Sequence, residues 1–162
     1  ADVRERRLDV GFIGVWPGQA LEGVEYRLLA EEELVVVLPV EHPLAKIRDL
    51  SLAHLEDQPL VDFPAGTGAR RQTDEAFAAA GLRHRVQFEV SNIRLVEKFV
   101  QRALAVGLVP ARIASDFRDV VTAQVRDAPR RHLYVIWSKS PTPAARAFVH
   151  MIEQSLAARG GG

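Results

Sequence analysis

Residues 29–45, LAEEELVVVLPVEHPLA, contain the stretch that decides the fold. Within it, residues 34–39 (LVVVLP) are apolar and rich in β-branched side chains, which predicts a strand covered on both faces. His42-Pro43 ends that strand, because a proline restricts the residue before it and donates no backbone hydrogen bond. A strand buried on both faces is typical of an α/β fold, in which helices pack on both sides of a sheet.

Short apolar runs alternate with helical stretches on both sides of this strand, which also indicates an α/β fold. Further strands are predicted at residues 8–13, 24–29, 60–63, 86–90, 108–109, 120–125 and 133–137. Longer helices are predicted at residues 69–80, after Ser91 or Asn92, and after Thr142 with Pro143 at its first position. Residues 50–55 and 111–116 predict shorter helical segments.

The composition describes a globular domain. The chain has 162 residues, of which 48% are hydrophobic and 26% charged, and its formal net charge is zero. A domain that mainly grips nucleic acid usually carries a basic excess, so DNA contact by this chain is not expected. The basic clusters at residues 4–7 (RERR) and 129–132 (PRRH) are interpreted as solvated surface.

Several kinds of site are not expected. The chain has no cysteine, which excludes disulfides and thiolate-ligated metals and is compatible with a cytoplasmic location. Its five histidines are scattered without metal-ligand spacing, and the serines show no nucleophile-elbow pattern. The run Glu31–Glu33 is interpreted as solvated charge. No apolar run approaches a membrane span, and we expect no catalytic residue, metal or cofactor.

The strongest candidate site follows the strand predicted at residues 60–63. Glycines allow a tight turn, Thr67 supplies a hydroxyl, and the first N–H groups of the next helix lack partners and carry partial positive charge. Together they suit a carboxylate or another small anion. The expected ligand contacts are Ala65, Gly66, Thr67, Gly68 and Arg70. The alternative is a capped turn with solvated arginines.

Two further segments are candidates for ligand contact. Asn92 starts a second helix and could touch a ligand, although the simpler interpretation is a helix cap. The other contacts are Ile13, Gly14 and Val15, which leave the first strand at its carboxyl end, where ligands of open α/β sheets bind.

Five segments, taken in order, resemble the effector-binding domain of LysR-type transcription regulators. They are LDVGFIG (8–14), LAEEELVVVLPVEHPLA (29–45), LEDQPLVDFPAGTGARRQTDEAFAAAGL (55–82), VSNIRLVEKFVQRALAVGLVP (90–110) and RRHLYVIWSKSPTPAARAFVHMI (130–152). The resemblance implies a two-lobed α/β fold of the type-2 periplasmic-binding-protein kind, with mixed sheets and an effector held between the lobes. Lobe I would comprise residues 1–23 and 130–162, and lobe II residues 24–129.

This chain departs from the family pattern. The strand–helix–strand unit that opens the family's effector domain and the winged helix-turn-helix that reads DNA have no counterpart, so lobe I is expected to be incomplete. Leu104 and Val106 stand where the family often has glycine and a small residue. The first strand would then expose an edge and an apolar face.

The resemblance implies a cytoplasmic, non-enzymatic sensor that binds a small, anionic effector and alters the geometry of a homodimer or tetramer. DNA would be contacted only through the absent N-terminal domain, and no membrane partner is expected. The outer face of the helix at 69–80, with Arg70, Arg71, Asp74 and Glu75, could contribute to a dimer surface. The alternatives are a transport-type solute-binding protein, a bilobal enzyme, and an interaction fragment without ligand.

Overall fold

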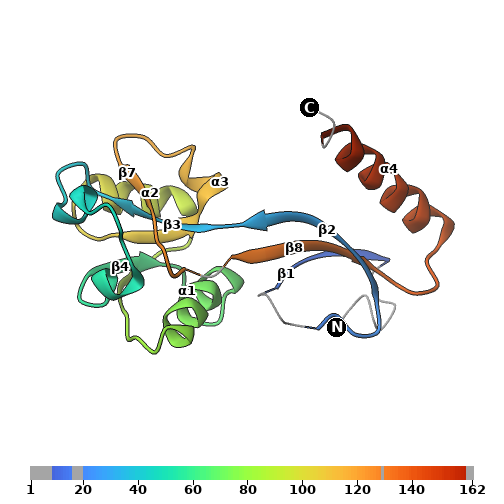
Figure 1. Cartoon of the computed structure of the whole chain (residues 1–162), viewed down its shortest axis with the longest axis horizontal. Coiled ribbons are helices and arrows are strands. Elements are labelled where there is room, and N and C mark those ends of the chain that lie inside the picture. Colours follow the sequence, from blue (N-terminus) through green and yellow to red (C-terminus); the bar gives the residue numbers. More distant parts are fainter. Residues whose placement is uncertain (1–8, 16–19, 129, 160–162) are drawn as a thin grey trace. The chain divides into compact units, whose positions relative to one another are not determined.

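A computed structural model describes residues 9–15, 20–128 and 130–159 of the chain (Figure 1). The chain divides into unit 1, Ala1–Glu32 with Arg130–Gly162, and unit 2, Glu33–Pro129. This division differs from the boundary expected after residue 23. The reason is that the strand following residue 24 pairs with the returning chain and therefore groups with unit 1.

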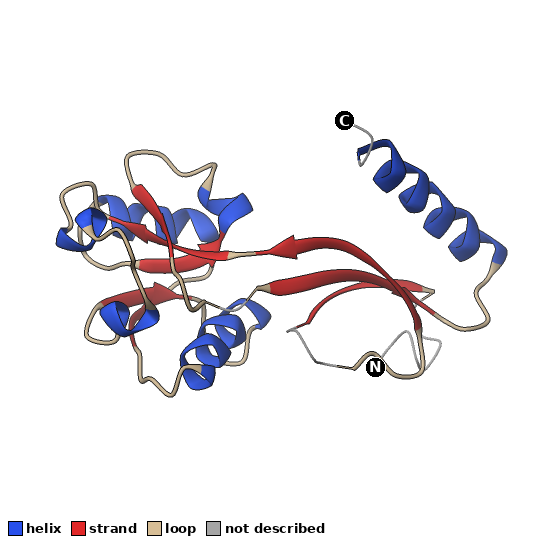
Figure 2. Cartoon of the chain, in the orientation of Figure 1, coloured by secondary structure: helices blue, strands red, loops and turns tan. Residues whose placement is uncertain are grey.

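Unit 1 contains an antiparallel sheet and one long helix. Strand β8 (Arg131–Trp137) lies between β1 (Val10–Val15) and β2 (Glu25–Glu32), and the helix α4 (Pro143–Arg159) follows β8 (Figure 2). Strands are present at the positions predicted, 8–13, 24–29 and 133–137, although residue 8 lies outside the described residues, and β1 and β2 continue beyond their predicted ends. Thr142 caps α4 as predicted, since its hydroxyl accepts a hydrogen bond from the Ala145 amide at 3.2 Å.

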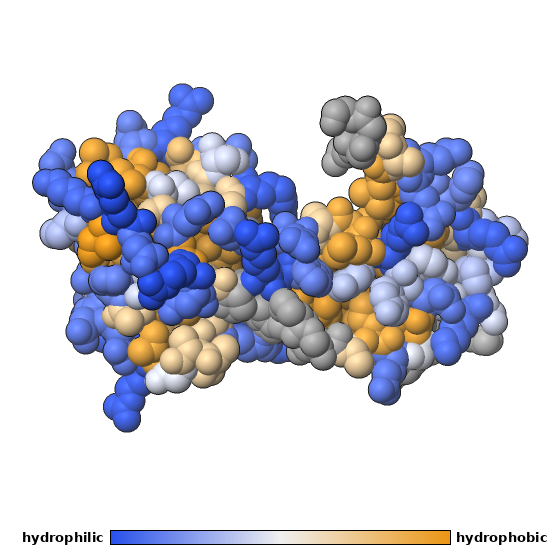
Figure 3. Space-filling view, in the orientation of Figure 1, coloured by the Kyte–Doolittle hydropathy of each residue, from blue (hydrophilic) through white to orange (hydrophobic). Residues whose placement is uncertain are grey.

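Part of the sheet of unit 1 is open to solvent. Val135 is fully buried, and Phe12 meets Phe148 of α4 edge-on at 6.4 Å between ring centroids. In contrast, Phe12, Tyr26 and Leu28 remain 59%, 52% and 41% exposed, and Figure 3 shows apolar side chains at the surface of this unit. Within the described residues β1 is an edge strand, so the open edge and exposed apolar side chains expected from the sequence are observed.

Unit 2 is built around the strand predicted at residues 34–39. Strand β3 (Leu34–Leu38) runs antiparallel between β6 (Gly107–Pro110) and β7 (Val121–Gln124). All five residues of β3 are buried, as predicted for a strand covered on both faces. Gly107 sits where a side chain would meet Val37 and Val96 at 3.0 Å, so the strand and the neighbouring helix approach closely because this residue has no Cβ.

The parallel part of unit 2 positions the candidate site. Strands β4 (Pro59–Asp62) and β5 (Arg85–Glu89) are parallel and are joined by helix α1 (Gly68–Ala79). Helix α2 (Ile93–Gln101) then connects β5 to β6. A parallel bridge between Leu60 and Val106 links β4 to the start of β6. The carboxyl ends of β5, β4 and β6 therefore lie at one edge of unit 2.

Helices α1 and α2 cover opposite faces of this sheet. Val61 belongs to a buried cluster with Val96 and Val100 of α2. Its neighbour Asp62 hydrogen bonds to Thr73 of α1. Because adjacent residues of a strand point to opposite faces, the two helices must lie on opposite sides of β4.

The short helices differ in detail from the predictions. The expected helix at 50–55 is a 3-10 turn, η2 (Leu52–Leu55), and the expected helix at 111–116 is α3 (Ala111–Ala114). An unpredicted 3-10 turn, η1 (Pro43–Lys46), follows His42. The His42 ring accepts a hydrogen bond from the Leu44 amide at 3.1 Å and so caps η1.

Candidate functional site

The loop between β4 and α1 is a tight, exposed turn. Gly66 adopts φ = +88°, a left-handed conformation that favours glycine. The Thr67 amide donates to the Pro64 carbonyl at 3.2 Å, and the Thr67 hydroxyl donates to the same carbonyl at 2.8 Å. The hydroxyl oxygen also accepts from the Arg70 amide at 3.3 Å, so Thr67 caps α1. Residues 64–69 are exposed.

The first turn of α1 is accessible to a ligand. The N–H groups of Gly68 and Ala69 stand where an α-helix has no internal acceptor. A Cβ atom placed on Gly66 or Gly68 would meet no atom within 4 Å, so open space adjoins this backbone. These N–H groups carry the partial positive charge of a helix start and can donate to an anion.

The strands that lead to α1 and α2 end side by side. Asn92 caps α2, since its side-chain oxygen accepts from the Leu95 amide at 3.1 Å, which confirms the predicted cap. Asp62, the last residue of β4, is paired in register with Glu89, the last residue of β5, and the Val90 amide donates to the Asp62 carbonyl at 2.9 Å. The loops that lead to Thr67 and Asn92 therefore leave the sheet side by side.

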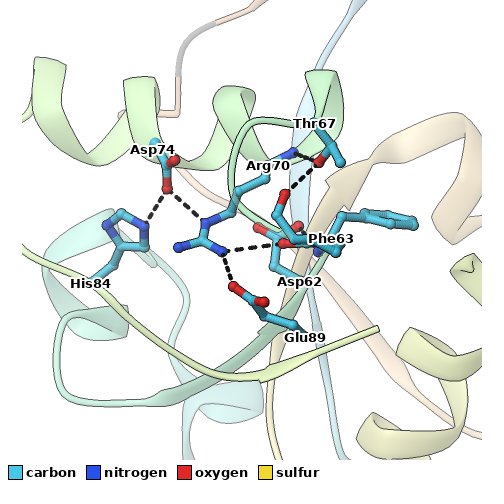
Figure 4. A network of polar contacts seen from close by, with 8 residues as sticks. Asp62, Phe63, Thr67, Arg70, Asp74, His84 and Glu89 are labelled. Carbon is cyan, nitrogen blue, oxygen red and sulfur yellow. Dashed lines mark hydrogen bonds and ion pairs between the residues drawn. The ribbon is translucent and has the colours of Figure 1, made fainter. Parts of the chain in front are cut away.

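Arg70 is held by several acceptors rather than displayed to solvent (Figure 4). Its Nε donates to Asp74 at 2.9 Å, and its Nη1 donates to the Phe63 carbonyl at 3.2 Å and to Glu89 at 3.1 Å. The Arg70 side chain is 15% exposed. Arg70 and Asp74, which the sequence placed on a possible dimer face, thus bind one another within the chain.

Two neighbours complete this network. His84 Nε2–H donates to the same Asp74 oxygen at 2.7 Å, and the His84 ring stacks on Phe77 with 4.8 Å between ring centroids. Asp62 is buried and accepts from the Phe63 amide at 2.7 Å. Burial raises the pKa of Asp62 above its ordinary value, although the hydrogen bonds from Thr73 and from the Phe63 amide oppose that rise.

The predicted contacts Ile13, Gly14 and Val15 belong to unit 1, whereas all the others belong to unit 2. Ile13 pairs with Tyr134 of β8, and Val15 is buried. Gly14 has a structural explanation of its own. A Cβ atom there would lie 2.5 Å from the guanidinium carbon of Arg131, so this arginine crosses β1 directly over Gly14.

Arg131 is ion-paired with Glu32 on β2, with 3.0 Å between Nε and a carboxylate oxygen. The interpretation of Glu31–Glu33 as solvated charge is wrong for Glu32, which is 8% exposed, and the basic cluster at 129–132 is likewise not wholly solvated. The two residues face each other across the β2–β8 ladder. Their 99-residue separation explains why the sequence pattern did not reveal the pair.

The structure therefore brings one set of predicted residues to a single edge of unit 2: Ala65, Gly66, Thr67, Gly68, Arg70 and Asn92. The sequence missed the acceptors that surround Arg70, of which Asp74 could have been found from its i+4 spacing. Glu89 could not, because it depends on the register of β4 and β5. Within the described ranges, no group of His, Asp or Glu is arranged to hold a metal ion, and no helix is long and apolar enough to cross a membrane.

Comparison with known proteins places the chain in a family. The chain is 31% identical over 147 residues to the RuBisCO operon transcriptional regulator of Allochromatium vinosum, covering 87% of this chain and 48% of that protein. It is 26% identical over 136 residues to the HTH-type transcriptional activator CmpR of Synechocystis, covering 82% of this chain and 44% of that protein. The chain thus spans about half the length of these relatives.

Solved structures share the fold. The Synechocystis CcmR regulatory domain in complex with 2-PG superposes with a TM-score of 0.79 at 16% identity, covering 96% of this chain and 76% of that one. The effector-binding domain of QuiR in complex with shikimate gives a TM-score of 0.72 at 22% identity, covering 93% and 73%. The α/β fold of the type-2 periplasmic-binding-protein kind, expected from the sequence, is therefore confirmed.

The family model for the LysR substrate-binding domain matches residues 1–157, nearly the whole chain. This chain therefore belongs to the LysR substrate-binding domain family.

Proposed function

We propose that the chain is the sensing module of a transcription regulator and that it binds a small organic anion at the edge of unit 2 where α1 and α2 begin. The observation that carries this proposal is the pairing of Asp62 with Glu89, which brings the strand ends that lead to the two capped helices side by side. Loops beyond the carboxyl ends of parallel strands are the usual ligand sites of α/β sheets.

The anionic character of the ligand is supported by the donors at this edge. The N–H groups of Gly68 and Ala69 point out of the first turn of α1, and both residues are exposed. The Asn92 side chain uses its oxygen for the cap, which leaves its amide group as a further donor. An anion near a helix start gains about 0.3–1 kcal/mol from the helix dipole at exposed sites, and up to ~2 kcal/mol where the site is partly buried.

We propose sensing rather than catalysis. The carboxylates nearest the loop are engaged: Asp62 accepts from the Phe63 amide, and Glu89 accepts from Arg70. A general base needs a carboxylate or imidazole within reach of the substrate proton, and these groups are already used to hold the loop. The two relatives described above are both named as transcription regulators.

The wider proposal follows the family. Ile13, Gly14 and Val15 remain proposed contacts from unit 1, and effector binding would favour one conformation of a cytoplasmic homodimer or tetramer. DNA contact is assigned to a different segment of the regulator, because this chain has no net positive charge.

The proposal is tested by thermal unfolding of the whole chain with a panel of small anions that includes 2-PG, shikimate and benzoate. A ligand at 100 times its dissociation constant should add about 2.7 kcal/mol to the free energy of unfolding. Thr67→Val should abolish that gain. Thr142→Val removes the matching cap from α4 of unit 1 and should leave the gain intact. Equal gains in both variants would contradict the proposed site.

A further inference from the structure

The sequence assigns Arg70 to the anion, but its contacts indicate a different role. In Figure 4 the side chain leaves its own backbone nitrogen on the side away from Thr67, and the guanidinium lies between Asp74 and Glu89. One positive charge therefore faces two carboxylates at 2.9 and 3.1 Å, so little of it is left to attract an effector.

The contacts of Arg70 join the two ends of the loop between β4 and α1, residues 63–67. The Phe63 carbonyl, at the start of the loop, accepts from Arg70 Nη1 at 3.2 Å, and Arg70 itself follows the loop in the first turn of α1. The same Nη1 reaches Glu89 at the end of β5. Glu89 lies three residues before Asn92, the cap of α2. Arg70 thus ties the start of α1 to the strand that leads into α2.

His84 and Phe77 hold Asp74, an acceptor of Arg70, in place. Asp74 Oδ1 is shared by Arg70 Nε and His84 Nε2, and His84 is held in turn by its stacking on the buried ring of Phe77. Such a network fixes the rotamers of its members, which is the usual requirement for positioning a binding loop. The cost of a cation in the first turn of a helix is offset by these acceptors.

We propose that Arg70 is a positioning residue: by binding Asp74, Glu89 and the Phe63 carbonyl together, it makes the loops before α1 and α2 one preorganised unit, and it does not itself contact the effector. The consequence for effector binding rests on the function proposed above. The structural part of the inference does not, and it is tested without any ligand.

The ligand-free test is amide hydrogen exchange of the whole chain. The Thr67 amide, bonded to the Pro64 carbonyl, reports on the first loop, and the Leu95 amide, bonded to Asn92, reports on the second. Arg70→Gln should accelerate exchange at both amides by at least about tenfold, as expected for the loss of charge-assisted hydrogen bonds. Arg71→Gln is the matched control, since Arg71 is the exposed neighbour in the same turn, and should leave both amides unchanged.

Two further variants separate positioning from simple charge. Arg70→Lys keeps the charge but lacks the planar guanidinium that reaches all three acceptors. Exchange of the Thr67 and Leu95 amides should therefore remain fast. Glu89→Gln should accelerate exchange as well, and the double variant Arg70→Gln/Glu89→Gln should exchange no faster than Arg70→Gln alone. Unchanged exchange in Arg70→Gln, or full rescue by lysine, would overturn the inference.

Binding of shikimate and 2-PG then distinguishes positioning by Arg70 from direct contact of Arg70 with the anion. Positioning predicts that Glu89→Gln weakens binding, because the loop is loosened. Direct contact of Arg70 with an anion predicts the opposite, because Glu89→Gln would release the arginine. If both anions fail to bind while the exchange pattern is as expected, the proposed ligand class fails and the role of Arg70 stands.

Discussion

Two glycines near the start of α1, Gly66 and Gly68, should respond in opposite ways to substitution by alanine. Gly66 has φ = +88°, whereas Gly68 is the first residue of α1 and has no positive φ. A Cβ atom meets nothing within 4 Å at either position, so contacts cannot cause a difference. Alanine at 66 should cost about 1–2 kcal/mol for a left-handed conformation, and alanine at 68 should stabilise by about 0.4–1 kcal/mol through the unfolded chain.

The expected gap between Gly66→Ala and Gly68→Ala is therefore about 1.5–3 kcal/mol in the free energy of unfolding. Urea denaturation followed by far-UV circular dichroism measures it. Tryptophan fluorescence provides an internal comparison, because Trp137 belongs to unit 1 and residues 33–129 contain no tryptophan. Equal stability of the two variants, or a less stable Gly68→Ala, would refute the reasoning.

The same pair of variants separates stability from binding. In Gly68→Ala the added methyl group occupies the open space beside the N–H groups of α1. This variant should therefore be more stable than the original chain and yet bind the effector more weakly. Calorimetric titration of both proteins with the same anion measures the difference, and unaltered affinity would mean that the ligand does not approach this backbone.

Three further predictions concern charged residues and their packing. Burial raises the pKa of Asp62, so the contribution of Asp62 to the free energy of unfolding is complete below pH 3.8, its ordinary pKa, and is lost as the pH rises through the pKa of the folded state. Asp62→Asn should remove this decline when the free energy of unfolding is measured against pH by urea denaturation. The hydrogen bond from the Arg118 amide lowers the pKa of Glu97, so Glu97→Gln should be less stable at neutral pH, and the difference should vanish as the pH falls below 4.5. Gly14→Ala should displace Arg131 from Glu32 and destabilise unit 1, but it should cost almost nothing in an Arg131→Ala background, as a double-mutant cycle by tryptophan fluorescence would show.

The parts of the fold that follow from local pattern were accessible from the sequence. The five consecutive apolar residues of β3 predicted a strand buried on both faces, which the structure contains. The caps at Asn92 and Thr142 were also predicted, because a cap depends only on a side chain and an amide three residues later.

The parts that depend on pairing between distant segments were not accessible. The contact between Arg70 and Glu89 could not be predicted, because Glu89 lies 19 residues away and reaches Arg70 only through the β4–β5 register. The close approach of Arg131 to Gly14 could not be predicted either, because nothing local reveals that Arg131 crosses above it. The division after Glu32, rather than after residue 23, depends on the same kind of contact, since β2 joins unit 1 by pairing with β8. In each case the missing information is a long-range contact rather than a local preference.

The most direct test of the account is an amide-resolved NMR titration of the isotope-labelled chain with the anion that stabilises it most. Binding at the edge of unit 2 predicts saturable shifts concentrated at residues 65–69 and 91–95, with the Arg70 side-chain signal still characteristic of its pairing with Asp74 and Glu89. Saturable binding that leaves both of these segments unshifted would contradict the account.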